Sequence, residues 1–400
     1  MHLEDDLYNL AMAYWELQTH NYDIEHQYHA LLGFDFAELG LTSILESTID
    51  RCGEIQATEK PLVEPDTDVI FRNEVAPVPN NSVINVAVRA IMSGGADFTH
   101  KADGWQIQGD RLEYKDTFEK AGTIIITIDN PEPVEVVQRF NILTLDVFMA
   151  VLGQVSCTYC ANRTSTPLSQ VSTVTARHIL RYKGVPSYGA KRWALIEKIS
   201  REMMLLGQLK VEVQGAATRN GTENYRGSLV ITEPVKREFN PFTKQYVVTS
   251  WRVRPGTWAV YDMSQDGRQY IGKLDHQVLL YDHREQRGAQ TFAKKLMYAL
   301  FVVPGGTYYL NNGAKKSLAD YLKLIGEYHE TDDASRNTRR RNLKRLGEAL
   351  DFLVGRHMIT TSMTGSVSGY IKARCKPWHL QDILDTVVEI KKINPVTCPT

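Results

Sequence analysis

The sequence has little of what marks secreted, membrane-spanning or disulfide-rich proteins. Only five of its 400 residues are cysteine, and their scatter excludes a disulfide framework. The start MHLEDDLYNL has neither a basic segment nor an apolar core, which excludes a secretory signal. The most apolar run, ILTLDVFMAVLGQV, contains Asp146 and is shorter than the about 20 residues that a membrane helix needs. We therefore expect a cytoplasmic globular protein of two or three domains without contact to a membrane.

Motifs of catalysis and metal binding are equally scarce. Cys157 and Cys160 form a CxxC that could join His178 in a zinc site, but no second CxxC and no closely spaced histidine pair follows. The segment GVPSYGAKR is similar to a P-loop, yet Ala190 stands in the lysine position. There is no G-x-S-x-G motif and no histidine pair of the kind that relaxase-type nickases need. We expect a protein that is not an enzyme and that holds no metal or cofactor.

Charge is unevenly spread along the chain, although the formal net charge is only -1. Residues 1–70 contain fifteen acids and two bases, a balance of -13, whereas the remainder carries +12. A basic rear is typical of a surface that meets a polyanion. The acidic front is expected either to cover the basic surfaces or to recruit a basic partner protein.

The composition predicts three regions. Helical periodicity in DLYNLAMAYWELQTH and in IEHQYHALLGFDFAELGLTSILESTI predicts an acidic helical N-terminal region, followed by a proline-rich linker. The segments GWQIQ, RLEYK and TIIITID predict a small β region. The domains that we expect are an N-terminal region and linker at 1–75, a first domain with the β region at 76–255, and a second domain at 256–400, each of the latter two a winged helix by the order of its elements.

After the β region, one order of elements occurs twice. The first pass predicts helices in LTLDVFMAVLGQV, STVTARHILRYKG and SYGAKRWALIEKISREMMLLGQL, then a hairpin of KVEVQ and SLVITE. The second pass predicts helices in TFAKKLMYALFVV, SLADYLKLIGEYH and DASRNTRRRNLKRLGEALDFLVGRH, then a hairpin of MITTSM and GYIKARC. The expected helix starts agree in spacing, since Thr291 follows Thr144 by 147 positions and Asp333 follows Ser187 by 146. This order is that of a winged helix, so the predicted fold class is α+β with two winged-helix domains in tandem.

The third helix of the second pass carries six basic side chains within the eleven positions 335–345. At about 100° per residue, the leucines from Leu343 to Leu353, together with Val354, form one buried stripe. Arg336 and Arg339 share the bearing of that stripe but precede its first leucine. A charged helix end can serve solubility alone, but a basic start ahead of a buried stripe is what a DNA recognition helix needs. The candidate DNA-binding residues here are Arg336, Asn337, Arg339, Arg340, Arg341, Lys344 and Arg345.

The first pass carries a sparser basic face. Its candidate DNA-binding residues are Arg177, Arg181, Lys183, Ser187, Tyr188, Lys191 and Arg192. Arg219 is predicted at the tip of the first wing, and Lys372 and Arg374 in the returning strand of the second. Arginine can read guanine edges, whereas lysine mostly contacts phosphate.

The tandem winged helices, the preceding β region, and NILTLDVFMAVL followed by a capped basic helix and LGQLKVEVQG resemble the replication initiator (Rep) proteins of plasmids and other mobile elements. The resemblance covers roughly residues 75–375, and residues 1–70 have no counterpart in it. It implies binding to repeated origin sequences, with one domain on each half of a site, followed by local opening of the duplex. The implied partners are double-stranded DNA and host replication proteins, and a homodimer is compatible with this role.

Two alternatives remain open at this stage. The chain could be a non-catalytic, nucleic-acid-binding or scaffold subunit of a larger nucleoprotein or defence complex. It could also be a transcriptional regulator, because initiation and repression begin with the same DNA contacts.

Overall fold

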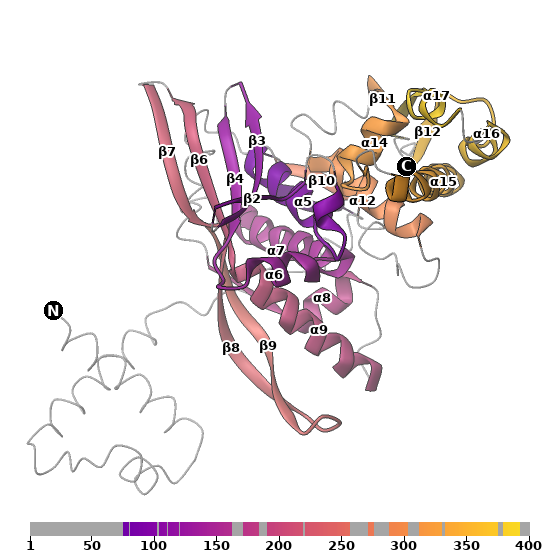
Figure 1. Cartoon of the computed structure of the whole chain (residues 1–400). Helices are drawn as coiled ribbons and strands as arrows, with labels where there is room; N and C mark the ends of the chain where they lie inside the picture. The colour runs from indigo at the N-terminus through magenta and orange to yellow at the C-terminus, as the bar shows by residue number, and fades with distance from the viewer. Residues whose placement is uncertain are drawn as a thin grey trace, which may run out of the picture. The chain divides into compact units, whose positions relative to one another are not determined.

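A computed structural model describes most of the chain after residue 74 (Figure 1). The described residues are 75–79, 81–101, 104–109, 111–119, 121–161, 171–183, 190–218, 221–256, 271–275, 288–302, 312–329, 333–374 and 379–392. The expected acidic helical region at 1–75 therefore lies outside the described residues except for its last position. The described chain is α+β, as the sequence predicts, and its sheets are small and antiparallel.

A five-stranded sheet joins three strands of residues 106–128 to two strands of residues 209–228. Its order is β2-β3-β4-β6-β7, built from β2 (Gln106–Gln108), β3 (Arg111–Phe118), β4 (Gly122–Ile128), β6 (Leu209–Thr218) and β7 (Gly221–Ser228). Alternate side chains such as Tyr114, Ile124 and Val211 are buried, as expected for a sheet with one covered face. Helix α5 (Ser82–Ser93), which the sequence analysis did not predict, contacts β3 and β4. Asn81 caps this helix by accepting a hydrogen bond from Ile84 N at 2.8 Å.

We call residues 142–255 the first repeat. It contains α7 (Ile142–Ala161), β5 (Ser172–Thr175), α8 (Ala176–Tyr182), α9 (Ala190–Gly207), β8 (Val230–Asn240) and β9 (Gln245–Pro255). The second predicted helix, STVTARHILRYKG, is a strand over its first four residues and a helix only from Ala176. Strand β5 pairs with β9, and β9 pairs with β8. Figure 1 shows the β8–β9 hairpin projecting alongside α9.

The predicted hairpin of KVEVQ and SLVITE is wrong. KVEVQ lies in β6, which pairs with β4 and with β7, so it belongs to the five-stranded sheet. SLVITE begins β8, whose partner is β9. The hairpin that closes the first repeat therefore lies about 20 residues later along the chain than alternation of side chains alone indicates.

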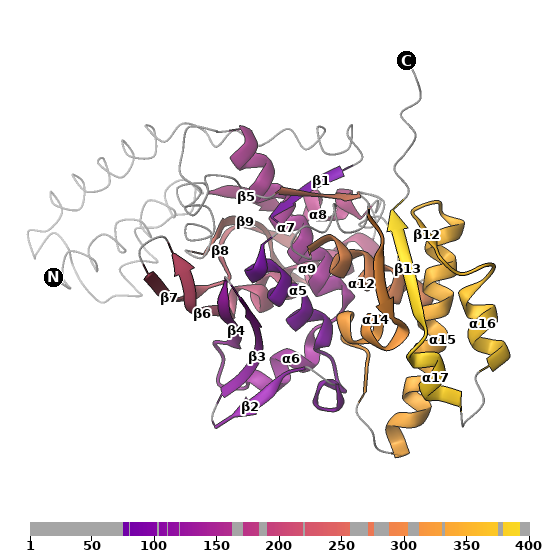
Figure 2. The ribbon, with the colours of Figure 1, turned by 90° about the horizontal axis from the view of Figure 1, so that it is seen from above.

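We call residues 289–392 the second repeat, and Figure 2 shows its elements gathered together. It contains α12 (Ala289–Val302), β11 (Ala314–Ser317), α14 (Leu318–Leu324), α15 (Asp333–Gly355), β12 (Ile359–Thr361), α16 (Val367–Arg374), α17 (Leu380–Leu384) and β13 (Val387–Lys392). Strand β13 pairs with both β11 and β12. The predicted returning strand GYIKARC is wrong, because those residues from Gly369 to Arg374 lie in helix α16 and the returning strand is β13.

Three further elements complete the description. Strand β1 (Val75–Pro79) pairs antiparallel with β10 (Ile271–Asp275), and α6 (Pro133–Arg139) precedes α7. A 3-10 turn (Phe98–His100) follows α5. Within the described part of the chain, no single helix is long and apolar enough to cross a membrane. Helices α6 and α7 meet that measure only as a pair bent by 87°.

One buried carboxylate connects the first helices of the two repeats. Asp146 on α7 accepts hydrogen bonds from the ammonium groups of Lys183 and Lys294, with Lys294 Nζ at 2.8 Å from Oδ2. Tyr298 on α12 donates its hydroxyl to Asp146 Oδ1 at 2.6 Å. Burial opposes ionisation of Asp146, but the two lysines hold the pKa of this carboxyl below its ordinary value. A charge that is fully buried is stable only while its partners remain in place.

Asp146→Asn should be far more destabilising than Lys294→Met. The amide leaves two buried ammonium groups without a counter-charge, which costs about 3–5 kcal/mol. Lys294→Met leaves Asp146 paired with Lys183 and hydrogen-bonded to Tyr298. Urea unfolding of both variants measures the difference. An equal or larger loss of unfolding free energy in Lys294→Met would contradict the view that Asp146 contributes more to stability than Lys294.

The stability of the fold should also depend on Lys294 in alkaline solution. Burial, only partly offset by Asp146, lowers the pKa of Lys294 to about 8 from an ordinary 10.5. Above pH 8 the folded state has lost a proton that the unfolded state keeps, so the free energy of unfolding rises with pH. This rise ends near pH 10, where the unfolded state also loses the lysine proton. Above that pH the raised pKa of Tyr298 makes the free energy of unfolding fall with pH. Unfolding curves from pH 8 to 10 should show this rise in the natural protein and in Lys315→Met, an exposed control. The rise should be smaller in Lys294→Met, where Lys101, whose pKa is also lowered by burial, is retained.

Candidate nucleic-acid interface

Helix α15 has one buried face and one basic, exposed face. Leu343, Leu346, Leu350 and Leu353 are fully buried, as their spacing predicts. Val354 is exposed at 37%, which places it outside the buried stripe to which the sequence analysis assigned it. Among the described side chains on the N-terminal half of the helix, from Arg336 onward, the exposed polar ones are Arg336, Asn337, Arg341 and Lys344. We call these four residues the α15 basic face.

Arg339 does not belong to this face. Its side chain is only 8% exposed, and no described atom accepts a hydrogen bond from its Nε. The reason is its position four residues before Leu343, which places both side chains on the same side of the helix. The protein covers this part of the helix, so the buried stripe begins one turn earlier than the first leucine.

Two further arginines of α15 lie beside the basic face and are half-buried. They are Arg340 and Arg345. The side chain of Arg345 packs against Gly288, where an added Cβ would stand 3.0 Å from Arg345 Nε. Lys344 Nζ lies 3.8 Å from Glu348 Oε1, the pairing that their i,i+4 spacing predicts. An exposed pair of this kind is weak and salt-sensitive, so it leaves Lys344 available to a phosphate.

Helix α16 lies along the C-terminal half of α15 (Figure 2). The approach is close, because a Cβ added at Gly347 would stand 3.0 Å from the Ser368 Cα. Asp351 on α15 caps α16, accepting hydrogen bonds from Val367 N at 2.7 Å and from Ser368 N at 3.0 Å. Partial burial opposes ionisation of Asp351, but the hydrogen bonds it accepts hold its pKa below the ordinary value.

The cations predicted for the second wing lie on this helix instead. Lys372 and Arg374 are exposed on α16, so they stand on a helix beside α15 and not on a strand. Arg374 lies over the ring of Tyr370 with its Cζ 4.5 Å from the ring centroid, and its Nη1 donates to the Tyr370 hydroxyl at 2.7 Å. A stacked guanidinium is held in one orientation with its remaining N–H groups facing outward.

The first repeat brings together fewer of its predicted residues. Arg177 is exposed at the start of α8, whereas Lys183 binds buried Asp146 and so does not face a phosphate. Arg192 is half-buried on α9, and no described atom accepts from its Nε. Arg181 lies on α8 and Lys191 on α9, but their side chains lie outside the described residues, as do Ser187, Tyr188 and Arg219 altogether.

Several exposed cations of the first repeat were missed by the sequence analysis. Lys198 and Arg201 are exposed on α9, Lys198 at the edge of the face that buries Leu195 and Ile199 and Arg201 farther round the helix. Applying the 100° rule to α9 as well as to α15 would have identified both. The β8–β9 hairpin adds a second exposed set, which consists of Lys236, Arg237, Lys244, Arg252 and Arg254. Sequence analysis did not identify that set, because it placed the hairpin of the first repeat in KVEVQ and SLVITE and not in β8 and β9.

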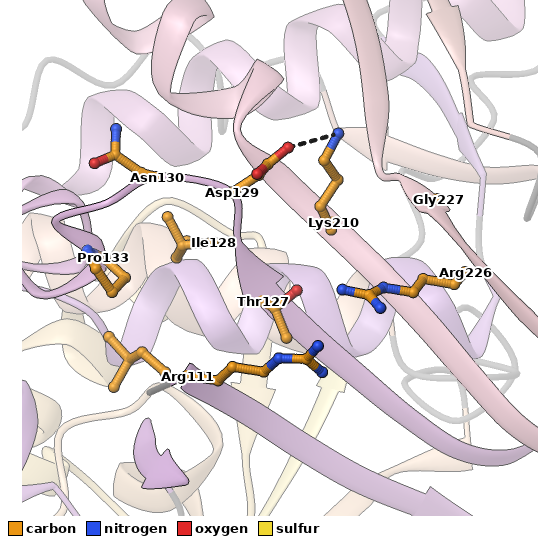
Figure 3. A pocket seen from close by; sticks show the side chains of 10 residues that line it. Arg111, Thr127, Ile128, Asp129, Asn130, Pro133, Lys210, Arg226 and Gly227 are labelled. Carbon is orange, nitrogen blue, oxygen red and sulfur yellow. Dashed lines mark ion pairs between the residues drawn. The ribbon is translucent and has the colours of Figure 1, made fainter. Parts of the chain in front are cut away.

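A shallow hollow of about 280 Å³ lies on the solvent side of the five-stranded sheet (Figure 3). Arg111, Lys210 and Arg226 line it from three different strands, together with Asp129. Lys210 Nζ lies 3.2 Å from Asp129 Oδ2 and 3.1 Å from Ser228 Oγ, so it is engaged within the sheet. Because a carboxylate stands among the cations, the hollow is a mixed polar surface and not an evident anion site. Among the described residues, no group of three or more His, Cys, Asp or Glu side chains could hold a metal ion.

Comparison with known proteins adds little. No family model and no curated protein matches the sequence. Two crystal structures of domains 2 and 3 of RctB share 10% identity with this chain. The alignment with one covers 64% of this chain and 85% of the RctB chain, with a TM-score of 0.34. The alignment with the other covers 76% of this chain and 95% of the RctB chain, with a TM-score of 0.33. TM-scores this low establish neither a common fold nor a common function.

Asp351→Ala should release α16 from α15. The substitution removes the acceptor of two backbone N–H groups and of the Ser366 hydroxyl, a capping loss of about 1–2 kcal/mol. Hydrogen exchange should show faster exchange of α16 amides while α15 stays protected. Asp382→Ala, at an exposed position of α17, is the matched control and should leave α16 unchanged. Unchanged α16 protection in Asp351→Ala would contradict the capping role.

Proposed function

We propose that each repeat is a winged helix and that the chain is a non-catalytic, sequence-specific double-stranded DNA-binding protein. In each repeat a helix, a short strand and two further helices follow one another, and two later strands complete one antiparallel sheet with the short strand. In the first repeat β6 and β7 lie between the third helix and these two strands, and in the second repeat α16 and α17 lie between the two strands. This is the order in which a winged helix places its third helix for the major groove. Helices α9 and α15 are the third helices in the two repeats.

The observation that carries the proposal is the α15 basic face. A helix packed through its C-terminal leucines and basic along its exposed N-terminal half presents cations and one amide to a groove while its own core holds it in place. Arg336 and Arg341 can make bidentate contacts to guanine or phosphate, and Asn337 can contact adenine. Lys344 supplies a phosphate contact.

Within this class we propose replication initiation at the repeated origin sequences of a plasmid or mobile element. Two third helices in one chain suit a site with two parts, which is the arrangement that the resemblance to Rep proteins implies. Selection of binding sites from a random duplex pool, followed by footprinting, tests this role. Enriched sites with two separate parts are expected, whereas no enrichment over random duplex would favour a scaffold subunit of a larger assembly.

The double variant Arg341→Ala/Lys344→Ala should reduce the salt dependence of DNA binding. Loss of two phosphate contacts lowers the slope of log affinity against log salt by up to about 1.8, at about 0.9 per contact. Fluorescence anisotropy with the selected duplex, over a series of salt concentrations, measures the slope. Arg139→Ala/Lys315→Ala removes the same charge from α6 and β11 and is the matched control. Equal slopes in the two double variants would overturn the assignment of the α15 basic face.

A further inference from the structure

The end of the β8–β9 hairpin presents aromatic side chains to solvent. Phe239 is 46% exposed, Phe242 60% and Tyr246 69%. Phe239 and Tyr246 oppose each other across the strands and make an edge-to-face contact with ring centroids 5.5 Å apart. Phe242 stands in the turn between them. Three large exposed aromatic side chains within eight residues form an apolar patch, and such patches mark contact surfaces.

The turn that carries Phe242 is held rigidly on α9. Asn240 is buried, its Oδ1 accepts from Phe242 N at 2.9 Å, and its Nδ2 donates to Glu197 Oε1 at 2.7 Å. The Thr243 hydroxyl donates to the same Glu197 oxygen at 2.9 Å. Lys244 closes the turn through a backbone hydrogen bond to Asn240 O and adopts a φ of 57°. The exposed phenyl ring is therefore presented by a preorganised loop that is fixed to the third helix of the first repeat.

The charges of the hairpin favour a polyanion as the partner of its aromatic patch. Strands β8 and β9 and their turn carry five cations, namely Lys236, Arg237, Lys244, Arg252 and Arg254, against the two carboxylates Glu233 and Glu238. Lys236 Nζ lies 3.2 Å from Glu238 Oε1, and Arg252 and Arg254 lie toward the other end of the strands, so Arg237 and Lys244 are the cations near the rings that have no such pairing among the described residues. The hairpin thus combines apolar rings at its end with a surplus of positive charge along its strands. Nucleic acid offers the matching combination, because its bases present π-faces and its backbone is anionic.

The outer strand of the hairpin has features that prevent it from pairing with the same strand of a second copy of the chain. Strand β8 is at the edge of its sheet, where another strand could add. It contains exposed Pro234, and its register shifts twice, between Pro234 and Lys236 and again between Lys236 and Arg237. Proline, bulges and charged side chains on an edge strand block strand addition. Pairing of two hairpins edge to edge is therefore disfavoured as the function of the exposed rings.

We propose that Phe242 is a wedge that enters a base step of duplex DNA bound by the first repeat, and that Lys244 contacts a flanking phosphate. This inference rests on the proposed DNA-binding function and deepens it. An apolar side chain inserted between base pairs unstacks the step and kinks the duplex, and flexible pyrimidine–purine steps yield most readily. An initiator that must open its origin would gain from such a distortion beside its contact helix.

Duplexes from the site selection, labelled with 2-aminopurine at successive positions of the footprint, test the wedge. Binding of the full chain should raise the fluorescence at one step, because unstacking relieves quenching. Phe242→Ala should abolish the rise while changing affinity by less than about tenfold, since the cations still hold the backbone. Phe242→Leu keeps an apolar wedge and should retain most of the rise. Lys244→Ala should weaken binding and lower the salt slope by about 0.9 but keep the rise.

Each contrary outcome has a distinct meaning. An undiminished rise in Phe242→Ala, or no rise at any labelled position with the natural protein, overturns the wedge while salt-dependent binding leaves the proposed function standing. Loss of self-association in Phe242→Ala, with unchanged DNA behaviour, would assign the rings to a second copy and also overturn the wedge. Absence of specific DNA binding by the natural protein overturns both proposals.

Discussion

The fold depends on a single buried carboxylate that is shared by helices far apart in the chain. Asp146 on α7 is bound by Lys183, which follows α8, and by Lys294 and Tyr298 on α12. Two ammonium groups and one carboxylate leave a net positive charge in the core, which a protein tolerates only where the hydrogen bonds are complete. The next lysine, Lys295, pairs with Glu327 and donates to Met92 O on α5 at 3.0 Å. Helix α12 of the second repeat is thereby tied to both α7 and α5.

This network explains why one candidate DNA contact was misplaced. From sequence, Lys183 at a helix end is indistinguishable from a surface lysine, because its partner lies 37 positions earlier in the chain. Asp146 itself could be noticed, since a carboxylate within an apolar helix must be neutralised, but the sequence does not say by which cation. Charge patterns of a sequence locate basic surfaces well only where no buried acid captures one of the cations.

The order of the helices was accessible from sequence, whereas the pairing of the strands was not. Apolar patterning placed α7, α9, α12, α14 and α15 correctly, because α9 and α15 each bury one apolar face and α7 and α12 are buried on nearly all sides. KVEVQ alternates as a strand should and pairs with the next strand, β7, but its other partner, β4, lies some 80 residues earlier, and no local signal encodes that second pairing. GYIKARC contains residues that suit a strand, yet Asp351, fifteen or more positions upstream, caps the segment as a helix. Where a distant side chain decides the local structure, propensity alone fails.

The two repeats reach a basic surface by different means. In the second repeat the cations stand on α15 itself, and the chain between β12 and β13 forms α16 and α17, which leave no long hairpin. In the first repeat the described side chains of α9 include two exposed cations, Lys198 and Arg201, and the long β8–β9 hairpin carries five cations and the exposed rings. If both repeats meet one duplex, the second is suited to read a groove through its helix. The first is suited to hold the DNA backbone and to deform the base stack through its hairpin. Base-sequence preference should therefore be strongest where α15 binds, and the deformability of the DNA should matter most where the hairpin binds.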